Sequence, residues 1–314
     1  MALRSRDLHI GFYGAVMGLA GLGLAARAAA PVFPGVLKAP AYFTEPWAAA
    51  ALIALVVLVC AYAVKLARSP AAVLQDFTDP ALLGFCGALP VGMTLVAGGI
   101  APYLPAAASM LWWAGCALLA AFQVWGVVRL LMGGVELARL NAGWFILMVG
   151  GIVVPGPGLA LGHAEASHFF FGISACVAPV LAALLVYRAA VAPPLPEALR
   201  PTWFILLVPP SLIYANGLAL FPGFQPLENL YFLALLLAGA LLVYARGFLR
   251  WPFAPAWWSF TFPLDALAYA GVRFAQDHPS PLWRGVAGAT LLLATLFVVL
   301  VLLRTLRSAA SRAA

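Results

Sequence analysis

The sequence predicts an all-α integral membrane protein, and three observations support this: composition, the length of the apolar runs and the lack of strand periodicity. Of the 314 residues, 65% are hydrophobic and only 9% are charged, with a mean hydropathy of +1.03. A soluble domain needs more polar surface than these residues supply. The apolar runs also lack the strict alternation of barrel strands. We therefore expect a single transmembrane domain over residues 1–314.

Proline, glycine and charged residues divide the apolar sequence into ten runs, each near the roughly 20 residues that a helix needs to cross a bilayer. Pairs of runs begin near residues 9, 80, 142, 202 and 257, at intervals similar enough to suggest a repeated unit. The pattern predicts five parallel helical hairpins, each entering the membrane from the same side. The expected helices lie near residues 9–28, 46–66, 80–100, 107–131, 142–162, 167–188, 202–221, 227–247, 257–277 and 283–306.

Lysine and arginine are distributed unequally between the two sides that these helices define. Thirteen of the 17 fall in loops and termini on the side of the N-terminus, and such an excess marks the cytoplasmic side. Both termini are therefore expected in the cytoplasm. The net charge of +7 follows from this topology and from attraction to anionic headgroups, so we expect no nucleic-acid partner.

The first helix of each expected hairpin differs in composition from the second. First helices are rich in glycine and hold six interior prolines, whereas the second helices hold only Pro179. A proline inside a helix leaves one carbonyl without its hydrogen bond, and within a bilayer that group finds a partner only against protein or water. The first helices should therefore surround a central pathway, although close packing alone would also explain the glycines. The six prolines are Pro90, Pro155, Pro157, Pro209, Pro210 and Pro263.

Polar and small residues on these inward helices are candidates for lining the pathway. Lysine and arginine are absent from the middle of the inward helices, so a ring of fixed charges is not expected. A weakly selective polar pore fits better, although each of these side chains could instead bond a neighbouring helix. The candidates are Tyr13, Gly18, Thr94, Ser211, Tyr214, Asn216, Ser259 and Thr261.

Asp265 is the one acid deep within an inward helix. An ionised carboxylate about 5 Å from a permeating anion would repel it by about 3 kcal/mol at an effective dielectric constant of about 20. We therefore expect Asp265 to be paired, protonated or turned aside. A protonated carboxyl would permit proton coupling, and a carboxyl bonded to neighbouring helices is the alternative.

No motif of an enzyme or a metal site is present. The sequence has no HExxH, CxxC, phosphate-loop or nucleophile-elbow pattern. His163 and His168 lie five residues apart, which is not the one-turn spacing of a helical zinc pair, and the four cysteines fall in separate apolar runs. We expect no catalytic activity, no metal and no cofactor.

Three segments, Gly11–Ala20, Arg200–Pro210 and Trp257–Leu264, resemble a known family in chain order. They are similar to the first, seventh and ninth helices of the tellurite-resistance/dicarboxylate transporter family, which includes the plant guard-cell slow anion channels and bacterial homologues. The most specific segment reads WWSFTFPL. The resemblance runs across nearly the whole chain. It implies ten helices in five hairpins around a central pore, and a homotrimer with one pore per subunit.

The resemblance also implies a gate. A phenylalanine of the ninth helix plugs the pore in this family, and it corresponds to Phe262, which precedes Pro263. The facing glycine of the first helix corresponds to Gly14. Some relatives have proline where this chain has Val16, so the glycines of the first helix would have to supply any bend. An apolar ring can close a narrow pore by excluding water and open it by changing rotamer.

The residues and the resemblance together predict an anion channel or channel-like permease of the bacterial cytoplasmic membrane. We expect it to pass small monovalent anions such as chloride or nitrate. The alternative is a proton-coupled transporter of sulfite, tellurite-type oxyanions or C4-dicarboxylates, for which Asp265 is the discriminating residue. The expected partners are small inorganic or organic anions and the lipid bilayer.

Overall fold

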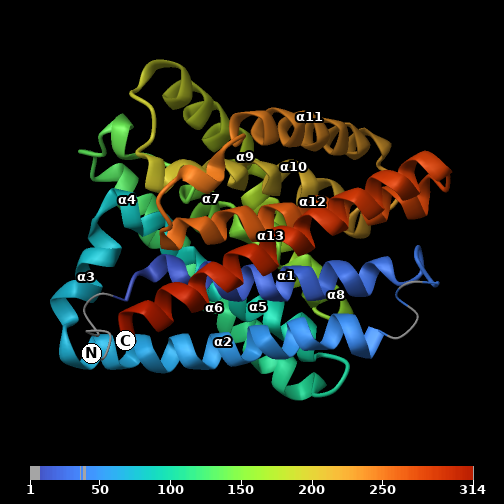
Figure 1. Ribbon diagram of the computed structural model, residues 1–314, viewed down its shortest axis with the longest axis horizontal. Helices are drawn as coiled ribbons and strands as arrows, with labels where there is room; N and C mark the ends of the chain where they lie inside the picture. Colours follow the sequence, from blue (N-terminus) through green and yellow to red (C-terminus); the bar gives the residue numbers. More distant parts are fainter. Residues whose placement is uncertain (1–7, 36, 38–39, 314) are drawn as a thin grey trace.

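The protein is a bundle of helices, many of which run along its longest axis (Figure 1). The structure is a computed structural model, and it describes residues 8–35, 37 and 40–313. These residues form helices, turns and loops, and no strand occurs among them, which confirms the predicted all-helical class. Three of the basic residues counted for orientation, Arg4, Arg6 and Lys38, lie outside the described residues.

Several 3-10 helices lie between the α-helices of the described chain. The α-helices are α1 Gly14–Ala29, α2 Pro40–Arg68, α3 Pro70–Thr78, α4 Pro80–Leu83, α5 Ala88–Ile100, α6 Pro105–Leu131, α7 Trp144–Met148, α8 Pro155–Ala160, α9 Ala164–Val191, α10 Val208–Leu220, α11 Glu228–Tyr244, α12 Thr261–Asp277 and α13 Pro281–Ala313. The 3-10 helices are η2 Ile10–Tyr13, η3 Gly84–Gly87, η4 Leu137–Arg139, η5 Gly150–Ile152, η6 Glu197–Leu207, η7 Gln225–Leu227, η8 Phe248–Arg250 and η9 Pro255–Phe260.

Eight helical stretches in the described part of the chain are long and apolar enough to cross a membrane. Each overlaps one of the ten expected spans, and ten crossings would also require the segments at 142–162 and 257–277. The second of these is helical from Pro255 to Asp277, through η9 and α12. The eight stretches are Ile10–Ala29, Phe43–Arg68, Pro80–Ile100, Pro105–Leu131, Ala164–Val191, Glu197–Leu220, Gln225–Tyr244 and Pro281–Ser311.

The segment expected as one helix at 142–162 is instead divided into α7, η5 and α8. The break comes at Val149, whose φ of −116° and ψ of 3° leave the α-helical region. Gly151 follows, and a Cβ added there would lie 2.5 Å from the carbonyl oxygen of Phe170 in α9. Glycine therefore permits this close approach of α9, and it also weakens the continuous helix that the apolar run predicts.

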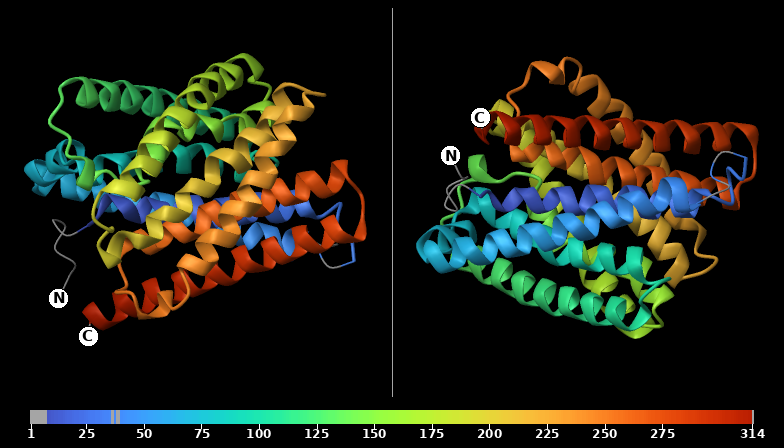
Figure 2. Two further views of the ribbon diagram at one scale, coloured as in Figure 1. Left: turned by 90° about the horizontal axis from the view of Figure 1, so that it is seen from above. Right: turned by 60° about the horizontal axis from the view of Figure 1, so that its bottom comes forward.

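The two kinds of helix that the sequence distinguishes lie at different depths. In the stretches that begin an expected hairpin, Ile10–Ala29, Pro80–Ile100 and Glu197–Leu220, 72–78% of an 18-residue window is buried. In the five second stretches this share is only 17–33%. Figure 2 accordingly shows α1 near the centre of the bundle and α6 and α13 at its periphery. The glycine- and proline-rich segments thus form an inner layer, covered by more uniformly apolar helices.

A 3-10 helix precedes an α-helix at a corresponding place in each of the five inner segments. The pairs are η2 with α1, η3 with α5, η5 with α8, η6 with α10, and η9 with α12. Proline has no N–H group and is tolerated in the first turn of an α-helix, where that group has no partner. The prolines therefore lie at these junctions and not at kinks in mid-helix. The third residue of the α-helix is Val16, Pro90, Pro157, Pro210 and Pro263 in turn.

The start of α1, helix α3 and the end of α13 lie at one end of the bundle (Figure 1). We call it the inner end, where the word refers to position along the bundle and not to the inner layer of helices. Two basic residues used to predict orientation, Lys65 and Arg188, are only 2% exposed. Lys65 Nζ lies 2.6 Å from Asp76 Oδ2, and Arg188 donates hydrogen bonds to the carbonyls of Leu140 and Ala138. Both cations therefore hold neighbouring segments together in addition to contributing charge.

Candidate ion pathway

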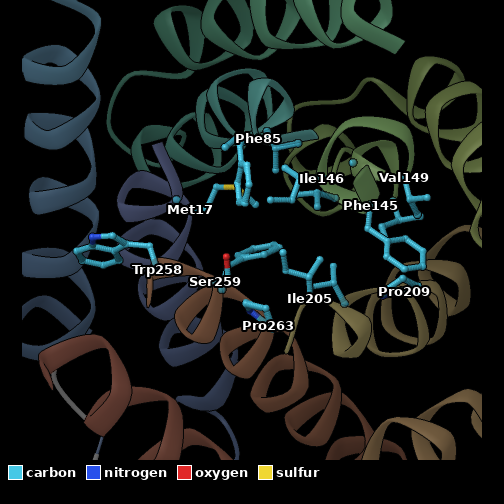
Figure 3. A pocket seen from close by; sticks show the side chains of 18 of the residues that line it. Met17, Phe85, Phe145, Ile146, Val149, Ile205, Pro209, Trp258, Ser259 and Pro263 are labelled. Atoms are coloured by element: carbon cyan, nitrogen blue, oxygen red, sulfur yellow. The ribbon is translucent and has the colours of Figure 1, made fainter. Parts of the chain in front are cut away.

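A small apolar cavity lies among the junctions of the five inner segments, and we call it the inner cavity. Its volume is about 40 Å³, which leaves room for a few water molecules at most. Figure 3 shows side chains from all five segments around it, including Met17, Phe85, Phe145, Ile205 and Trp258. Every residue in its wall belongs to an inner segment or to the short breaks within it.

A second cavity, the outer cavity, lies farther along the same five segments. Its volume is about 290 Å³, enough for a cluster of water molecules. Its wall again comes from the inner segments alone: α1, α5, α8 with the preceding turn, α10 and α12. Unlike the inner cavity, it contains charged side chains, Arg27 and Asp265, and it also contains the polar side chains of Asn216 and Tyr269.

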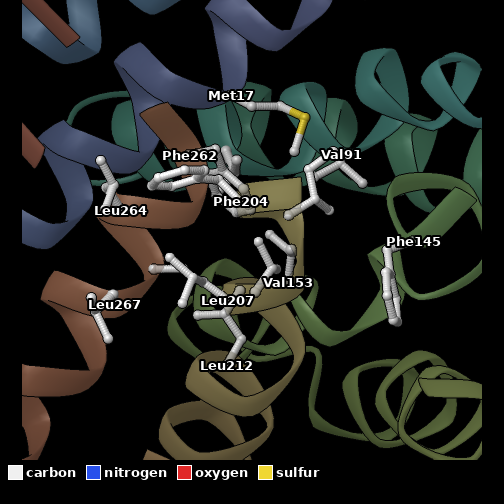
Figure 4. Close-up of a cluster of buried hydrophobic side chains, with 14 of the residues drawn as sticks. Met17, Val91, Phe145, Val153, Phe204, Leu207, Leu212, Phe262, Leu264 and Leu267 are labelled. Atoms are coloured by element: carbon white, nitrogen blue, oxygen red, sulfur yellow. The ribbon is translucent and has the colours of Figure 1, made fainter. Parts of the chain in front are cut away.

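Phe262 and Val153 line both cavities and no other residue does. Phe262 is the second residue of α12, and its side chain is 6% exposed. Figure 4 shows it in an apolar cluster with Met17, Val91 and Val153, which come from three other inner segments. An aromatic ring from one segment and an aliphatic side chain from another therefore stand between two cavities that share one axis of helices.

Gly21 is the glycine that lies directly against the Phe262 ring, whereas the resemblance assigned the facing place to Gly14. A Cβ added to Gly21 would lie 2.9 Å from Phe262 Cδ2 and 2.9 Å from Asp265 Oδ2. Gly14 does line the inner cavity, but a Cβ added there would meet Trp258 Cβ at 3.0 Å. Gly21 therefore leaves the space in which the Phe262 ring and the Asp265 carboxyl lie.

Asp265 is buried, with 1% of its surface exposed, and it lies in the wall of the outer cavity. Neither of its carboxyl oxygens has a hydrogen-bond partner among the described residues. The alternative in which neighbouring helices bond this carboxyl is therefore not found in the described part of the chain. Buried polar groups are nearly always paired, so an unpaired carboxyl beside a cavity marks a place where water or a ligand can meet it.

Arg27 lies in the wall of the outer cavity, near the C-terminal end of α1. Its guanidinium donates to the carbonyl oxygens of Gly98 and Gly99, each at 3.0 Å, at the end of α5. It also lies 3.2 Å from Glu45 Oε1 of α2, and both side chains are about one quarter exposed. These bonds fix the position of the cation in the partly exposed part of the cavity wall, which we call the outer mouth, and the carboxylate of Glu45 offsets part of its charge.

Several residues predicted to line the pathway face neighbouring helices instead. The Tyr13 hydroxyl donates to the carbonyl of Leu58 in α2 at 3.2 Å. Thr94 donates within its own helix. Gly18 lies directly against the Thr261 side chain, which packs α1 on α12. None of these predicted residues lines either cavity, and the Tyr13 bond is the contact to a neighbouring helix that the sequence left open as the alternative.

The remaining polar candidates divide between the cavities and the core. Ser259 lines the inner cavity, and Asn216 lines the outer cavity while donating to the Ile152 carbonyl. Ser211 and Tyr214 are buried away from both cavities, and Tyr214 stacks on a tyrosine of α11. The wall of the inner cavity is apolar apart from Ser259 and backbone groups, so most of the predicted polar residues lie outside it.

Sequence reasoning missed Val153, Gly21 and Arg27. Gly21 continues the spacing of Gly11, Gly14 and Gly18 at intervals of three and four residues, which places all four near one helix face. That spacing was the available signal. Val153 gave none, because an aliphatic residue in an apolar run resembles every other one.

The SLAC1 family, described as voltage-dependent anion channels, has a family model that matches residues 7–306. The S-type anion channel SLAH3 of Arabidopsis thaliana is 28% identical over 160 residues, which cover 51% of this chain and 25% of that protein. SLAH2 of the same plant is 29% identical over 121 residues, covering 38% and 23%. An uncharacterized transporter of Methanocaldococcus jannaschii is 30% identical over 170 residues, covering 46% and 47%.

These matches span less than half the length of the curated relatives. The family model nevertheless covers nearly the whole chain. The resemblance found in the three sequence segments is therefore confirmed. The chain belongs to the SLAC1 family of voltage-dependent anion channels.

Proposed function

We propose that this protein is an anion channel or channel-like permease that passes small monovalent anions, such as chloride and nitrate, along its two cavities. The observation that carries the proposal is the shared wall: five separated segments contribute to both cavities, which meet at Phe262 and Val153. Helices around a common axis are the usual means of building a membrane pore, and an apolar constriction closes such a pore by excluding water.

The proposed closed gate is the Phe262 ring. An anion at this level has no polar side chain to replace its hydration shell, since the surrounding cluster is apolar. The outer cavity beside the ring offers about 290 Å³, into which the ring can turn by changing rotamer. Pro263 lies in the first turn of α12, so it fixes the junction that holds the ring, and loosening of the helix by Pro263 is not required.

The wider arrangement is also part of the proposal. We infer ten crossings in five hairpins, with η9 and α12 and the divided segment at 142–162 completing the eight long spans. The alternation of inner and outer layers supports this arrangement. We further propose a homotrimer in the bacterial cytoplasmic membrane with both termini in the cytoplasm, which the basic residues at the inner end favour.

Proton-coupled transport of sulfite, tellurite-type oxyanions or C4-dicarboxylates is the second candidate function. The observation that favours it is the unpaired Asp265 carboxyl in the outer cavity. A carboxyl that loads and releases a proton during each cycle would couple the two movements. In that case uphill anion movement would follow an imposed pH gradient, whereas a channel would give only downhill flux.

The test is anion flux from proteoliposomes under an imposed voltage. Phe262→Ala should raise chloride and nitrate flux by about tenfold or more, because a tenfold change corresponds to only about 1.4 kcal/mol of barrier. Phe262→Leu, a smaller apolar plug, should give an intermediate value. The control is Phe169→Ala, since Phe169 is 59% exposed on α9 and lies outside both cavities.

The folded state of each variant is checked by its elution profile and thermal unfolding in detergent. Equal flux in wild type, Phe262→Ala and Phe169→Ala, with all three folded, would reject Phe262 as the gate. Flux that appears only with a pH gradient would replace the channel with the coupled transporter.

A further inference from the structure

Asp265 lies on the outer side of the proposed gate. It follows Phe262 by three residues in α12, so the two side chains share one face of the helix. The glycine contact supports this placement, because a Cβ at Gly21 would meet Phe262 Cδ2 and Asp265 Oδ2 at the same distance, 2.9 Å. An anion that passes between the gate and the outer mouth therefore has to pass this carboxyl.

The surroundings of the Asp265 carboxyl leave it free to bind and release a proton. It is 1% exposed, and neither oxygen is hydrogen-bonded by the described residues. The cavity beside it, about 290 Å³ in volume, has room for water that can deliver a proton. A buried carboxyl with no fixed donor is stabilised in its neutral form more easily than one held by a lysine or an arginine.

The other charged and titratable groups around this cavity are few. From α1 comes Arg27, whose guanidinium is held by Glu45 of α2 and by two carbonyls, with no bond to Asp265. From α12 itself comes Tyr269. The contribution of α10 is the amide of Asn216, which is committed to the Ile152 carbonyl. The helices α11 and α13 and the 3-10 helices η6 and η9, which also pack on α12, contribute no residue to the cavity wall.

The interaction of an anion with the outer cavity depends on whether the Asp265 carboxyl carries a proton. When Asp265 is ionised, its charge has no hydrogen-bond partner among the described residues and repels any anion in the outer cavity. When the carboxyl is neutral, the repulsion is gone and the O–H group can donate a hydrogen bond to the anion. Binding of one proton to Asp265 thus changes the interaction of the outer cavity with an anion from repulsive to attractive.

We propose that Asp265 is a proton-binding site that controls anion passage through the outer cavity. The ionised carboxylate blocks anions, and a proton that arrives from the outer solution lets them pass. This inference rests on the anion pathway proposed above. It differs from proton coupling, because the proton stays on the protein while many anions pass. Acid on the outer side should therefore raise flux in both directions, and no proton should accompany the anions.

The experiment uses the Phe262→Ala protein, so that the gate does not limit flux. The pH on the outer face is lowered from about 8 to about 5 at constant internal pH, and anion flux is measured in each direction together with proton uptake. Flux should rise by about tenfold or more on acidification. Adding Asp265→Asn, which keeps the shape without the charge, should give the high flux at every pH.

Asp277→Asn is the matched control, because Asp277 lies at the outer end of α12 but outside the outer cavity, and it should keep the pH response. An unchanged pH response in Asp265→Asn would overturn the inference and leave the anion pathway intact. Proton uptake in fixed ratio to anions would overturn it in favour of coupling. Failure of Phe262→Ala to conduct at any pH would instead reject the pathway itself, and the inference with it.

Discussion

The inner and outer cavities are built by the same five segments, yet they differ in size and chemistry. The inner cavity measures about 40 Å³ and is apolar apart from Ser259, whereas the outer measures about 290 Å³ and contains Arg27, Asn216 and Asp265. The inner cavity lies at the junctions of 3-10 and α-helices, where glycine and proline bring the segments close. The outer cavity is lined by the α-helices beyond. In the proposed pathway, closure and ion chemistry are therefore separated along the axis.

The ion pairs at the two ends of the bundle also differ, in how deeply they are buried. At the inner end, the side chains of Lys65 and Asp76 are only 3% and 7% exposed, and the hydroxyl of Tyr62 also donates to Asp76. At the outer end, Arg27 and Glu45 are 27% and 24% exposed beside the cavity. The inner pair is therefore placed to stabilise the fold, whereas the outer pair is placed where the proposed pathway would expose it to ions.

The largest effect on stability is expected from Lys65→Met. It leaves the Asp76 carboxylate buried without its cation, and breaking a buried pair in this way destabilises by about 3–5 kcal/mol. The substitution also removes the hydrogen bond from Lys65 Nζ to the Leu8 carbonyl. Thermal unfolding in detergent measures the loss. The double variant Lys65→Met with Asp76→Leu should recover part of it, because no buried charge is left alone.

If the stable double variant changed anion flux in the Phe262→Ala background, the distinction between an inner pair for folding and an outer pair for permeation would be wrong. Unchanged flux with restored stability would assign the inner pair to folding. Arg27→Gln, by contrast, should reduce stability by no more than about 1 kcal/mol, because a partly exposed pair contributes little.

Arg27→Gln should instead act on permeation. Removing the cation at the outer mouth lowers the local anion concentration, and we expect flux in the Phe262→Ala protein to fall by about two- to fivefold at low ionic strength. Glu45→Gln should change flux in the opposite direction, since it removes the carboxylate that offsets Arg27. Both effects should shrink at about 1 M salt, where screening acts within a few ångströms. Equal effects at low and high salt would indicate a structural role for Arg27.

The sequence predicted the layers of the fold well because composition reports burial. Glycine and proline marked the inner segments, and the pairing of Phe262 with Pro263 marked a junction that the structure contains. The side chains in the cavity walls were predicted only in part: Phe262, Pro263, Gly14, Ser259, Asn216 and Asp265 line a cavity, whereas Tyr13, Gly18, Thr94, Ser211, Tyr214 and Thr261 do not. A 3-10 helix has about 3.0 residues per turn and an α-helix about 3.6, so each junction changes the direction in which later residues point.

The place opposite Phe262 was assigned to Gly14 through the family resemblance. Gly14 begins α1 and lines the inner cavity together with Phe262. The face-to-face contact belongs to Gly21, two turns later. Val153 could not have been found at all, because its role depends on the broken segment from α7 to α8, which brings an ordinary aliphatic side chain to the axis.

The smallest predicted effect concerns His9, whose Nδ1 accepts a hydrogen bond from the Gly11 amide at 2.9 Å and so caps η2. Burial lowers the pKa of His9 from its ordinary 6.5, with Asp76 and Lys65 acting in opposite directions. The fold thus favours the neutral imidazole, so stability is complete above about pH 6.5 and declines as the pH falls from there toward the lower pKa of the folded state. His9→Asn keeps an acceptor for the cap but does not titrate. Between about pH 7.5 and about pH 5, the Tm of His9→Asn should therefore fall slightly less than the Tm of the wild type. An equal fall in the two proteins would place the acid sensitivity away from His9, and the outer cavity would remain as the region expected to respond to protons.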